Sequence, residues 1–276
     1  MREVRAKKNL GQHFLTDLGV ARRIASTISE GELAKCPRGE MAPEWGRLPV
    51  VEIGPGMGVL TRFLLEDKRE VVCVELDTES VEYLHREIPS LDVREADFLQ
   101  VNPSELAEGP VALIGNYPYN ISSQIFFRVL ETREKYPVVA GMLQKEVAER
   151  ICSAPGGKVY GILSVLLQAW YDCRYLFTVP PTVFSPPPKV QSGVLVLTRN
   201  SRESLGCDEK LFKRIVKTTF GQRRKTLRNS MRAVTGGKDV LPDDAMMSLR
   251  PERLSVDDFI RLTKATEEVL KSGNGE

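Results

Sequence analysis

The segment Val50-Val51-Glu52-Ile53-Gly54-Pro55-Gly56-Met57-Gly58 decides the fold. A short β-rich run leads into a turn with three glycines, and the following residues 59–67 have the apolar spacing of a helix. In an open α/β sheet such a turn lies at the carboxyl end of a strand, where ligands bind. Its spacing is G-x-G-x-G rather than the G-x-G-x-x-G of dinucleotide folds, so by itself the turn fits a plain strand–helix connection equally well.

Strand and helix patterns alternate on the carboxyl side of this segment. Further strands are predicted at residues 70–76, 91–97, 111–116 and 138–144. Helices are predicted at residues 17–29 (with Asp17 as N-cap), 78–88, 122–131 and 145–151. Continuous apolar strands that alternate with helices indicate a parallel sheet covered on both faces. Residues 30–49 are rich in Gly, Pro and charge, and are predicted to form an exposed loop.

The pattern changes after a predicted helix at 160–170. Residues 171–180 and 190–200 read as two strands, and the Pro-rich link between them is too short for a helical crossover. We therefore expect an antiparallel pair at the edge of a mostly parallel seven-stranded sheet. From residue 201 onward only helical patterns remain, which predicts a small all-α domain.

Composition excludes several classes of protein. The 276 residues are 42% hydrophobic and 28% charged, as in ordinary globular domains and unlike collagen-like, disordered or disulfide-scaffold chains. The sequence has no apolar run long enough to span a membrane, and the basic N-terminus lacks the apolar core of a secretory signal, so a cytoplasmic location is expected. The five cysteines lack C-x-x-C spacing and the two histidines, His13 and His85, are far apart, so no metal site is predicted.

The net charge of +2 hides a strong asymmetry. Residues 1–10 have a net charge of +3, and residues 210–232 contain nine cations and no acid, which leaves −10 for the rest of the chain. Runs of charge are often only solvated helix faces. Nine uncompensated cations in one stretch favour nucleic-acid binding.

Acidic residues follow the next two strands. Glu75 ends the second strand, about 20 residues after the glycine turn, where a carboxylate can accept hydrogen bonds from ribose hydroxyls. Asp97 ends the third strand and precedes Phe98, a pair suited to an adenine amine and ring. Each acid alone could be a solvated strand end or a turn residue. Together with Gly54 and Gly56 they favour an adenosine-containing cofactor.

The fourth strand ends in Ile114-Gly115-Asn116-Tyr117-Pro118-Tyr119-Asn120. Asn followed by x-Pro-aromatic resembles the catalytic tetrapeptide of S-adenosylmethionine-dependent methyltransferases that act on exocyclic amines. Residues 8–15, KNLGQHFL, are similar to a K-x-x-G-Q-N-F-L signature. Residues 179–190, VPPTVFSPPPKV, are similar to V-P-P-x-x-F-x-P-x-P-K-V.

These motifs, with FGQRRKTL (220–227) and RLSVDDF (253–259), resemble the small-subunit ribosomal RNA adenine dimethyltransferase A family over nearly the whole chain. The resemblance implies a Rossmann-like methyltransferase domain at 1–200 and a helical rRNA-binding domain at 201–276. It implies dimethylation of N6 on two adjacent adenosines in a 3′-terminal hairpin of 16S rRNA, during biogenesis of the 30S subunit. S-adenosylmethionine would be the methyl donor and no metal would be needed. We expect a monomer whose partner is 16S rRNA in an immature 30S subunit, with no membrane contact.

The family's functional residues are carried over position by position. Cofactor contacts are expected from His13, Leu15, Gly54, Gly56, Glu75, Asp97 and Asn116. Catalytic roles are expected for Asn116, for Tyr119 as a surface on which the target base stacks, and for Phe184 closing its other face. RNA binding is expected from Arg223, Arg224, Lys225 and Arg228.

Two of these positions, and Tyr117 within the tetrapeptide, have a qualification. His13 stands where the family has Asn, so a contact there would have to come from the backbone. Tyr117 stands where Leu is commoner, a change we expect to be tolerated because only the backbone carbonyl is needed. Phe184 could equally be a hydrophobic plug beneath the Pro-rich loop.

Other functions remain open from the sequence. A large-subunit rRNA adenine methyltransferase of the macrolide-resistance type shares the tetrapeptide and the core. A non-catalytic assembly factor of the small subunit is a different class, against which the intact segment Asn116–Tyr119 argues. A protein glutamine or DNA adenine methyltransferase is a weaker alternative, since the tetrapeptide alone does not separate amide, DNA and RNA amines.

Overall fold

The computed structural model describes residues 4–35 and 43–272, which fold into two compact units. Unit 1 comprises Met1–Glu149 and Tyr171–Asn200, and unit 2 comprises Arg150–Trp170 and Ser201–Glu276. The segment 150–170 therefore packs with the C-terminal helices, whereas the sequence placed it in the first domain. The reason is tertiary: Tyr160 from this segment packs against Phe220, with 6.1 Å between ring centroids. Helical periodicity does not reveal which helices such a segment joins.

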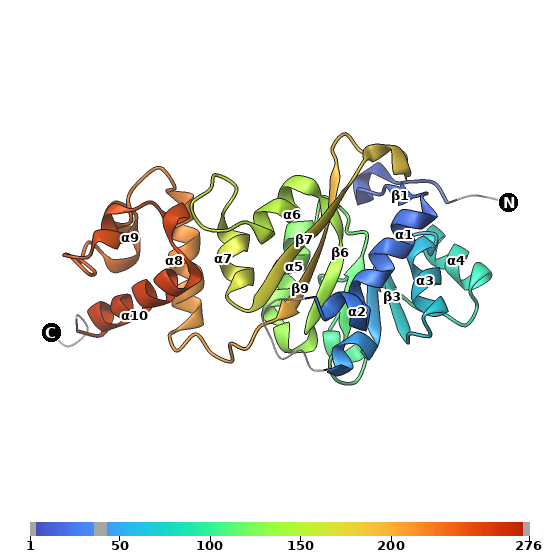
Figure 1. The fold of residues 1–276 in the computed structure, drawn as a ribbon, viewed down its shortest axis with the longest axis horizontal. Helices are drawn as coiled ribbons and strands as arrows, with labels where there is room; N and C mark the ends of the chain where they lie inside the picture. The colour runs from blue at the N-terminus through green and yellow to red at the C-terminus, as the bar shows by residue number, and fades with distance from the viewer. Residues whose placement is uncertain (1–3, 36–42, 273–276) are drawn as a thin grey trace. The chain divides into compact units, whose positions relative to one another are not determined.

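Unit 1 is built on a seven-stranded sheet in the order β4-β3-β2-β5-β6-β9-β7 (Figure 1). The strands are β2 (Val50–Ile53), β3 (Val71–Glu75), β4 (Asp92–Glu95), β5 (Ala112–Gly115), β6 (Val138–Gln144), β7 (Tyr171–Val179) and β9 (Ser192–Arg199). The five strands β4 to β6 pair in parallel, and β9 is antiparallel to both of its neighbours, β6 and β7. The predicted mostly parallel sheet with an antiparallel edge is confirmed. The sequence did not predict the order of the last two strands. The last strand in the chain, β9, lies between β6 and β7, so that β7 forms the edge of the sheet.

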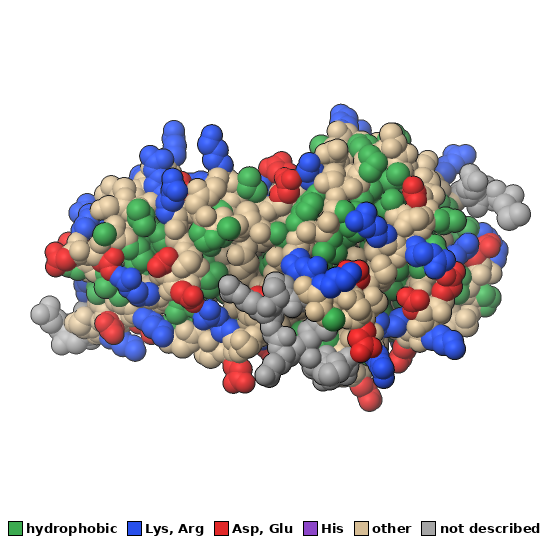
Figure 2. All heavy atoms as spheres, in the orientation of Figure 1, with side chains coloured by type: hydrophobic (Ala, Val, Ile, Leu, Met, Phe, Trp, Pro, Cys, Tyr) green, Lys and Arg blue, Asp and Glu red, His purple; other side chains and the backbone are tan. Residues whose placement is uncertain are grey.

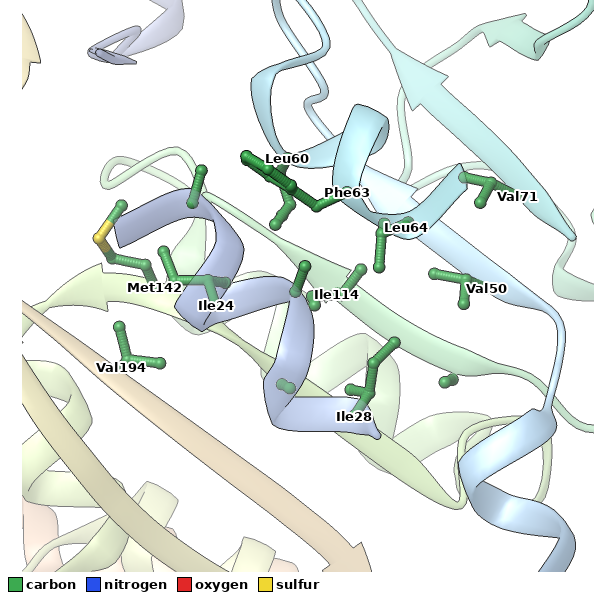
Figure 3. Close-up of a cluster of buried hydrophobic side chains, with 14 of the residues drawn as sticks. Ile24, Ile28, Val50, Leu60, Phe63, Leu64, Val71, Ile114, Met142 and Val194 are labelled. Carbon is green, nitrogen blue, oxygen red and sulfur yellow. The ribbon is translucent and has the colours of Figure 1, made fainter. Parts of the chain in front are cut away.

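One face of the sheet is covered by α1 (Leu18–Ala25), η2 (Ser26–Ile28) and α3 (Val59–Glu66). Asp17 caps α1, as predicted, by accepting a hydrogen bond from the Val20 N–H at 2.9 Å. Figure 3 shows Ile24 and Ile28 pointing toward the strands beside Phe63 and Leu64 of α3. Alternate strand residues such as Val51 and Leu113 are equally buried. Because successive side chains of a strand point to opposite faces, both faces of the sheet are covered.

Other helices connect or flank the strands of unit 1. They are η1 (Lys8–Leu10), α4 (Thr78–Glu87), η4 (Pro103–Glu105), α5 (Ser122–Glu131), η5 (Arg133–Lys135), α6 (Lys145–Cys152) and η6 (Pro181–Val183). The helices predicted at 78–88, 122–131 and 145–151 are thus confirmed. Among the described residues, no helix is both long and apolar enough to cross a bilayer.

The region 30–49 is not simply an exposed loop. It contains α2 (Glu30–Leu33) and η3 (Pro43–Arg47), while residues 36–42 lie outside the described part. Leu33 is fully buried and Trp45 packs against the same apolar cluster. Arg69 donates to the Gly46 and Leu48 carbonyls at 2.7 and 2.6 Å. The prediction was wrong because average composition conceals the few apolar side chains that find the core.

A second, two-stranded sheet joins β1 (Phe14–Leu15) to β8 (Phe184–Ser185). Leu15 is paired with Phe184, and the Thr16 N–H donates to the Val183 carbonyl at 2.8 Å. The N-terminal segment and the Pro-rich loop are thereby joined across almost 170 positions of sequence. Strands of two residues have no periodicity, so the sequence did not predict this sheet.

Unit 2 is helical. Its elements include α7 (Ile162–Gln168), α8 (Glu209–Gly221), α9 (Leu227–Thr235), η7 (Ala245–Ser248), η8 (Pro251–Arg253) and α10 (Val256–Ser272). Asp208 caps α8 by accepting from the Lys210 and Leu211 N–H groups. Phe220 packs on Phe259 of α10 as well as on Tyr160, with centroids 6.0 Å apart. These aromatic contacts build the core of the unit.

Candidate active site

A pocket lies at the carboxyl ends of the parallel strands of unit 1. Its walls are residues 10–15 of the N-terminal segment, the glycine turn, the ends of β3 and β4, and the turn after β5. The pocket is lined by eight of the predicted residues: His13, Leu15, Gly54, Gly56, Glu75, Asp97, Asn116 and Tyr119. Parallel strands bring their carboxyl ends to one edge of a sheet, which is why residues distant in sequence meet here.

The glycine turn forms part of the pocket wall. Gly54 and Gly56 have φ values of 64° and 55°, a region that other residues rarely adopt. A Cβ on Gly54 would have no atom nearer than 3.9 Å and would occupy open space beside Pro118. A Cβ on Gly56 would lie 3.0 Å from the Phe14 ring. Gly54 therefore keeps room for a ligand, whereas Gly56 allows the N-terminal segment to pack closely.

Glu75 places a buried carboxylate in this wall. Its Oε1 accepts from the N–H groups of Leu76 and Asp77 at 2.8 and 2.9 Å, and its Oε2 accepts from the Gly56 N–H at 3.1 Å. Burial raises the pKa of Glu75, and these three hydrogen bonds oppose that rise. A carboxylate has about four acceptor positions, so capacity remains for a hydroxyl donor from a ligand.

Asp97 is both a turn residue and a pocket residue. Its Oδ1 accepts from the Leu99 N–H and its Oδ2 from the Gln100 side chain, each at 2.9 Å. The neighbouring Phe98 lines the pocket while being only 5% exposed. The two interpretations that the sequence left open for Asp97 are therefore compatible.

The turn after β5 fixes the direction of the Asn116 amide. Its Nδ2 donates to the His13 carbonyl at 3.0 Å. Since a carbonyl only accepts, the amide nitrogen must face His13, and Oδ1 points away from it. The following backbone is held as well, because the Tyr117 N–H donates to the Met142 carbonyl at 2.8 Å.

The turn accommodates the large side chain of Tyr117 by burying it. The side chain is 1% exposed and donates through Oη to the Ala140 carbonyl at 2.6 Å. A Cβ on Gly115 or Gly141 would lie 3.1 or 2.8 Å from the Tyr117 ring. The ring thus occupies space that two glycines leave free, and it does not displace the turn after β5.

Tyr119 places a half-buried ring in the pocket wall, on the turn after β5. Its Oη lies 2.5 Å from Ser192 Oγ, and its ring centroid lies 5.5 Å from that of His13. His13 donates from Nδ1 to the Pro186 carbonyl at 2.8 Å. His13 therefore contacts the Asn116 side chain through its backbone, while its imidazole joins the N-terminal segment to the Pro-rich loop.

Phe184 differs from the other candidates. It is 4% exposed, belongs to the apolar cluster of unit 1, and is not among the described residues that line the pocket. The structure favours the alternative interpretation, a hydrophobic plug beneath the Pro-rich loop. The cause is the pairing of β8 with β1, which turns the ring inward beside Leu15.

Asp77 is a buried acid beside the pocket that sequence reasoning missed. It is 2% exposed, forms an ion pair with Lys7, and accepts from Gln12 Nε2 at 3.2 Å. Burial by itself raises the pKa of Asp77, but the hydrogen bonds from Lys7, Gln12 and Ser80 outweigh it and lower the pKa. The available signal was an acid two residues after Glu75 and a Lys and a Gln around the N-terminal signature. These contacts hold the N-terminal segment, whose residues 10–15 line the pocket.

Glu52 is a second buried carboxyl that the sequence did not single out. It is 1% exposed, and Cys73 Sγ lies 3.8 Å from its Oε2. Burial is the largest cause that raises its pKa to about 7, with Glu75 contributing in the same direction. The group is consequently poised between its neutral and charged forms near physiological pH.

In unit 2, the predicted RNA-binding residues fall into two kinds. Arg223 donates to the Gly157 carbonyl at 3.1 Å and lies 3.6 Å from Glu252, and Arg228 donates to the Pro242 carbonyl at 2.7 Å. Arg224 and Lys225 are exposed at the turn between α8 and α9. Figure 2 shows Lys and Arg side chains gathered in this region. Arg223 and Arg228 thus also hold loops of the unit. Arg224 and Lys225 are exposed, and Lys225 Nζ donates to Gln222 Oε1 within the same turn at 3.0 Å.

The described residues contain no group of three or more His, Cys, Asp or Glu side chains placed to hold a metal ion.

The sheet order and a pocket at the carboxyl ends of its strands, closed by an Asn-Tyr-Pro-Tyr turn, define a Rossmann-like methyltransferase. A family model, ribosomal RNA adenine dimethylase, matches residues 3–266. The chain belongs to that family and is a methyltransferase that modifies ribosomal RNA.

Two relatives and two solved structures show the extent of the similarity. The proteins named ribosomal RNA small subunit methyltransferase A from Bacteroides thetaiotaomicron and Porphyromonas gingivalis are 56% and 57% identical, over 99% and 95% of this chain and 98% of each relative. A dimethyladenosine transferase from Plasmodium falciparum has a TM-score of 0.73 at 22% identity, over 93% of this chain and 98% of that one. The 23S rRNA methyltransferase ErmE has a TM-score of 0.59 at 24% identity, over 92% of this chain and 99% of that one. At these identities the structures support the fold alone.

Proposed function

We propose that this enzyme transfers methyl groups from S-adenosylmethionine to N6 of two adjacent adenosines in a 3′-terminal hairpin of 16S rRNA, two to each base. The names of the relatives, at 52–57% identity, support the small subunit as the substrate. The observation that supports the chemistry is the orientation of Asn116, whose amide nitrogen is occupied by His13. The enzyme is proposed to act as a monomer in the cytoplasm on immature 30S particles.

The pocket fits the proposed methyl donor. The acceptor oxygens of Glu75 suit ribose hydroxyls, and Asp97 with Phe98 suits an adenine amine and ring. The space that a Gly54 side chain would fill remains open for the ligand. When bound, S-adenosylmethionine supplies an electrophilic methyl group attached to a sulfonium.

Adenine N6 is a poor nucleophile because its lone pair is delocalised into the ring. Asn116 Oδ1 and the Tyr117 carbonyl can accept hydrogen bonds from its two N–H groups and draw the amine toward tetrahedral geometry. N6 then forms its bond to the methyl group as the S–CH₃ bond breaks, which leaves a neutral thioether, and the acidified N6 proton passes to water. Fixed geometry rather than a strong base supplies the rate enhancement.

The target base has to leave its stack to reach this turn. Tyr119 is proposed to take it up, and base–aromatic stacking contributes about 1–3 kcal/mol per base. Phe184 is not proposed to contact the base, because its side chain is buried in the apolar cluster. In unit 2, Arg224 and Lys225 are proposed to bind phosphates, which sets register without reading sequence.

Labelled methyl transfer tests this function. The protein is given 30S particles that lack the modification, protein-free mature 16S rRNA, 23S rRNA and duplex DNA in parallel. We expect N6,N6-dimethyladenosine in the 30S sample, mapped by primer extension to two adjacent positions. Methylation of 23S rRNA in preference to the 30S sample would establish the large-subunit alternative. Binding to 30S particles without transfer would establish the assembly-factor alternative.

A further inference from the structure

Ser192 is buried and forms its side-chain contact with the ring that is proposed to receive the target base. It is the first residue of β9, it is 0% exposed, and its Oγ lies 2.5 Å from Tyr119 Oη. Neither the motifs nor the proposed chemistry gives this residue a role.

The reversed direction of β9 explains why Ser192 reaches Tyr119. The parallel strands deliver their last residues to the pocket edge of the sheet, and an antiparallel strand delivers its first residue to that same edge. Ser192 accordingly pairs with Gln144 at the end of β6 and with Val179 at the end of β7. The adjacent Gln191 carbonyl accepts from the Lys145 N–H at 3.0 Å. Ser192 is thus a fixed point in the sheet.

Tyr119, in contrast, is on a turn and is only partly buried, as a stacking surface must be. The hydrogen bond to Ser192 holds the phenol end of its ring, and the His13 ring lies 5.5 Å away at 35°. The tilt and position of the ring are therefore set from the sheet. A base stacked on it inherits that position, and a misplacement of about 1 Å can cost about 100-fold in rate.

The two methyl transfers differ in how much they need this ring. An unmodified N6 amine offers two N–H bonds, one for Asn116 Oδ1 and one for the Tyr117 carbonyl. A monomethylated amine offers only one, so the base loses one of its two polar contacts. Stacking on Tyr119 must then supply a larger share of the positioning in the second transfer.

We infer that Ser192 is a positioning residue which, through its hydrogen bond to Tyr119, promotes the second methyl transfer to each adenosine more than the first. This inference rests on the proposed function, and specifically on Tyr119 as the stacking surface for the base. Ser192 itself contacts neither the base nor the methyl donor.

A double-mutant cycle on the full-length protein tests the inference. The variants are Ser192→Ala, Tyr119→Phe and the two combined, assayed on unmodified 30S particles, with the ratio of N6-monomethyl- to N6,N6-dimethyladenosine measured by mass spectrometry. We expect each single variant to lower kcat about 3- to 10-fold, to raise the monomethyl fraction, and to leave the cofactor Kd unchanged. Because both substitutions break the same bond, the double variant should resemble each single variant.

Thr198→Val is the matched control, because Thr198 is on the same strand, is also buried, and pairs with Val138 at the opposite end of β6 from Gln144, the partner of Ser192. It should leave both the rate and the product ratio unchanged. Tyr119→Phe keeps the ring and breaks the bond from the partly exposed side, so the test does not depend on the folding of the Ser192 variant.

Two results would overturn the inference: an unchanged product ratio in Ser192→Ala, or losses in the double variant that equal the product of the single losses. A wild-type protein that leaves the 30S hairpin unmethylated would instead refute the proposed function. The two failures are thus distinguishable.

Discussion

The polar side chains at the pocket of unit 1 and those on the basic surface of unit 2 differ in how firmly hydrogen bonds hold them. At the pocket, the polar side chains are held by other groups: Glu75 accepts three backbone hydrogen bonds, Asn116 is oriented by His13, and Asp77 is held by Lys7 and Gln12. At the α8–α9 turn, Arg224 and Lys225 are exposed, and the Lys225 side chain has an exposed hydrogen bond to Gln222 of the same turn. Chemistry on an amine requires fixed geometry, whereas attraction to phosphates requires only charge at the right distance. Substitutions should therefore affect the two units in different measurements.

The largest effect is expected at Asn116. Asn116→Ala removes an acceptor that the proposed transition state needs, so single-turnover methyl transfer should fall on the order of 100- to 1,000-fold. The melting temperature should change little, because the side chain lies at the pocket surface. Asn102→Ala, which removes a side-chain cap of η4 in the same unit, is the control and should keep its activity. Activity within a few-fold of wild type in Asn116→Ala would refute the assigned role.

Glu52 gives a pH-dependent effect within unit 1. Its pKa of about 7 lies above the unfolded value of about 4.3, so the folded state favours the neutral form. Stability should therefore be full below about pH 4 and decline as the pH rises toward and past 7, by about 2–4 kcal/mol in total. Urea unfolding of wild type and Glu52→Gln at pH 5.5 and 8.5 checks this. The variant should be less sensitive to pH, and parallel curves for the two proteins would contradict the expectation.

In unit 2, Arg224→Ala with Lys225→Ala should weaken rRNA binding on the order of tenfold at moderate salt. The slope of log K against log salt should decrease by about 2, since two phosphate contacts are lost. Binding of S-adenosylmethionine should be unchanged by calorimetry. The exposed Arg62 on α3 supplies the control, as Arg62→Ala should alter neither ligand. Equal losses of RNA and cofactor binding would contradict the assignment of RNA binding to unit 2 and cofactor binding to unit 1.

The smallest effect is expected for His13→Asn, which introduces the residue typical of the family. The contact with Asn116 comes from the His13 carbonyl, which every residue has. The cofactor Kd should change by less than about threefold. A loss of tenfold or more would show that the imidazole itself takes part in the pocket.

Sequence reasoning predicted the sheet and most of the pocket because both follow from local patterns. The apolar runs of β2, β3, β5 and β6, the glycine turn, and the acids at strand ends are properties of neighbouring residues, and parallel topology brings strand ends together. The family motifs added the Asn116 turn and the basic helix. What the sequence did not reveal is long-range packing: the contacts of the 150–170 segment, Leu33 and Trp45 in the predicted loop, and which of the two interpretations of Phe184 the buried ring favours.

By itself the sequence determined the class of fold, the edge of the sheet at which the pocket lies, and the family, because strand alternation, turn chemistry and motifs are encoded within short stretches. The tertiary structure decided which side chains hold which. Leu15 with Phe184, Lys7 with Asp77, and Ser192 with Tyr119 are separated by 70 or more positions. No local periodicity records such pairs, because they exist only once the reversed strand β9 and the N-terminal segment have docked on the same edge of the sheet.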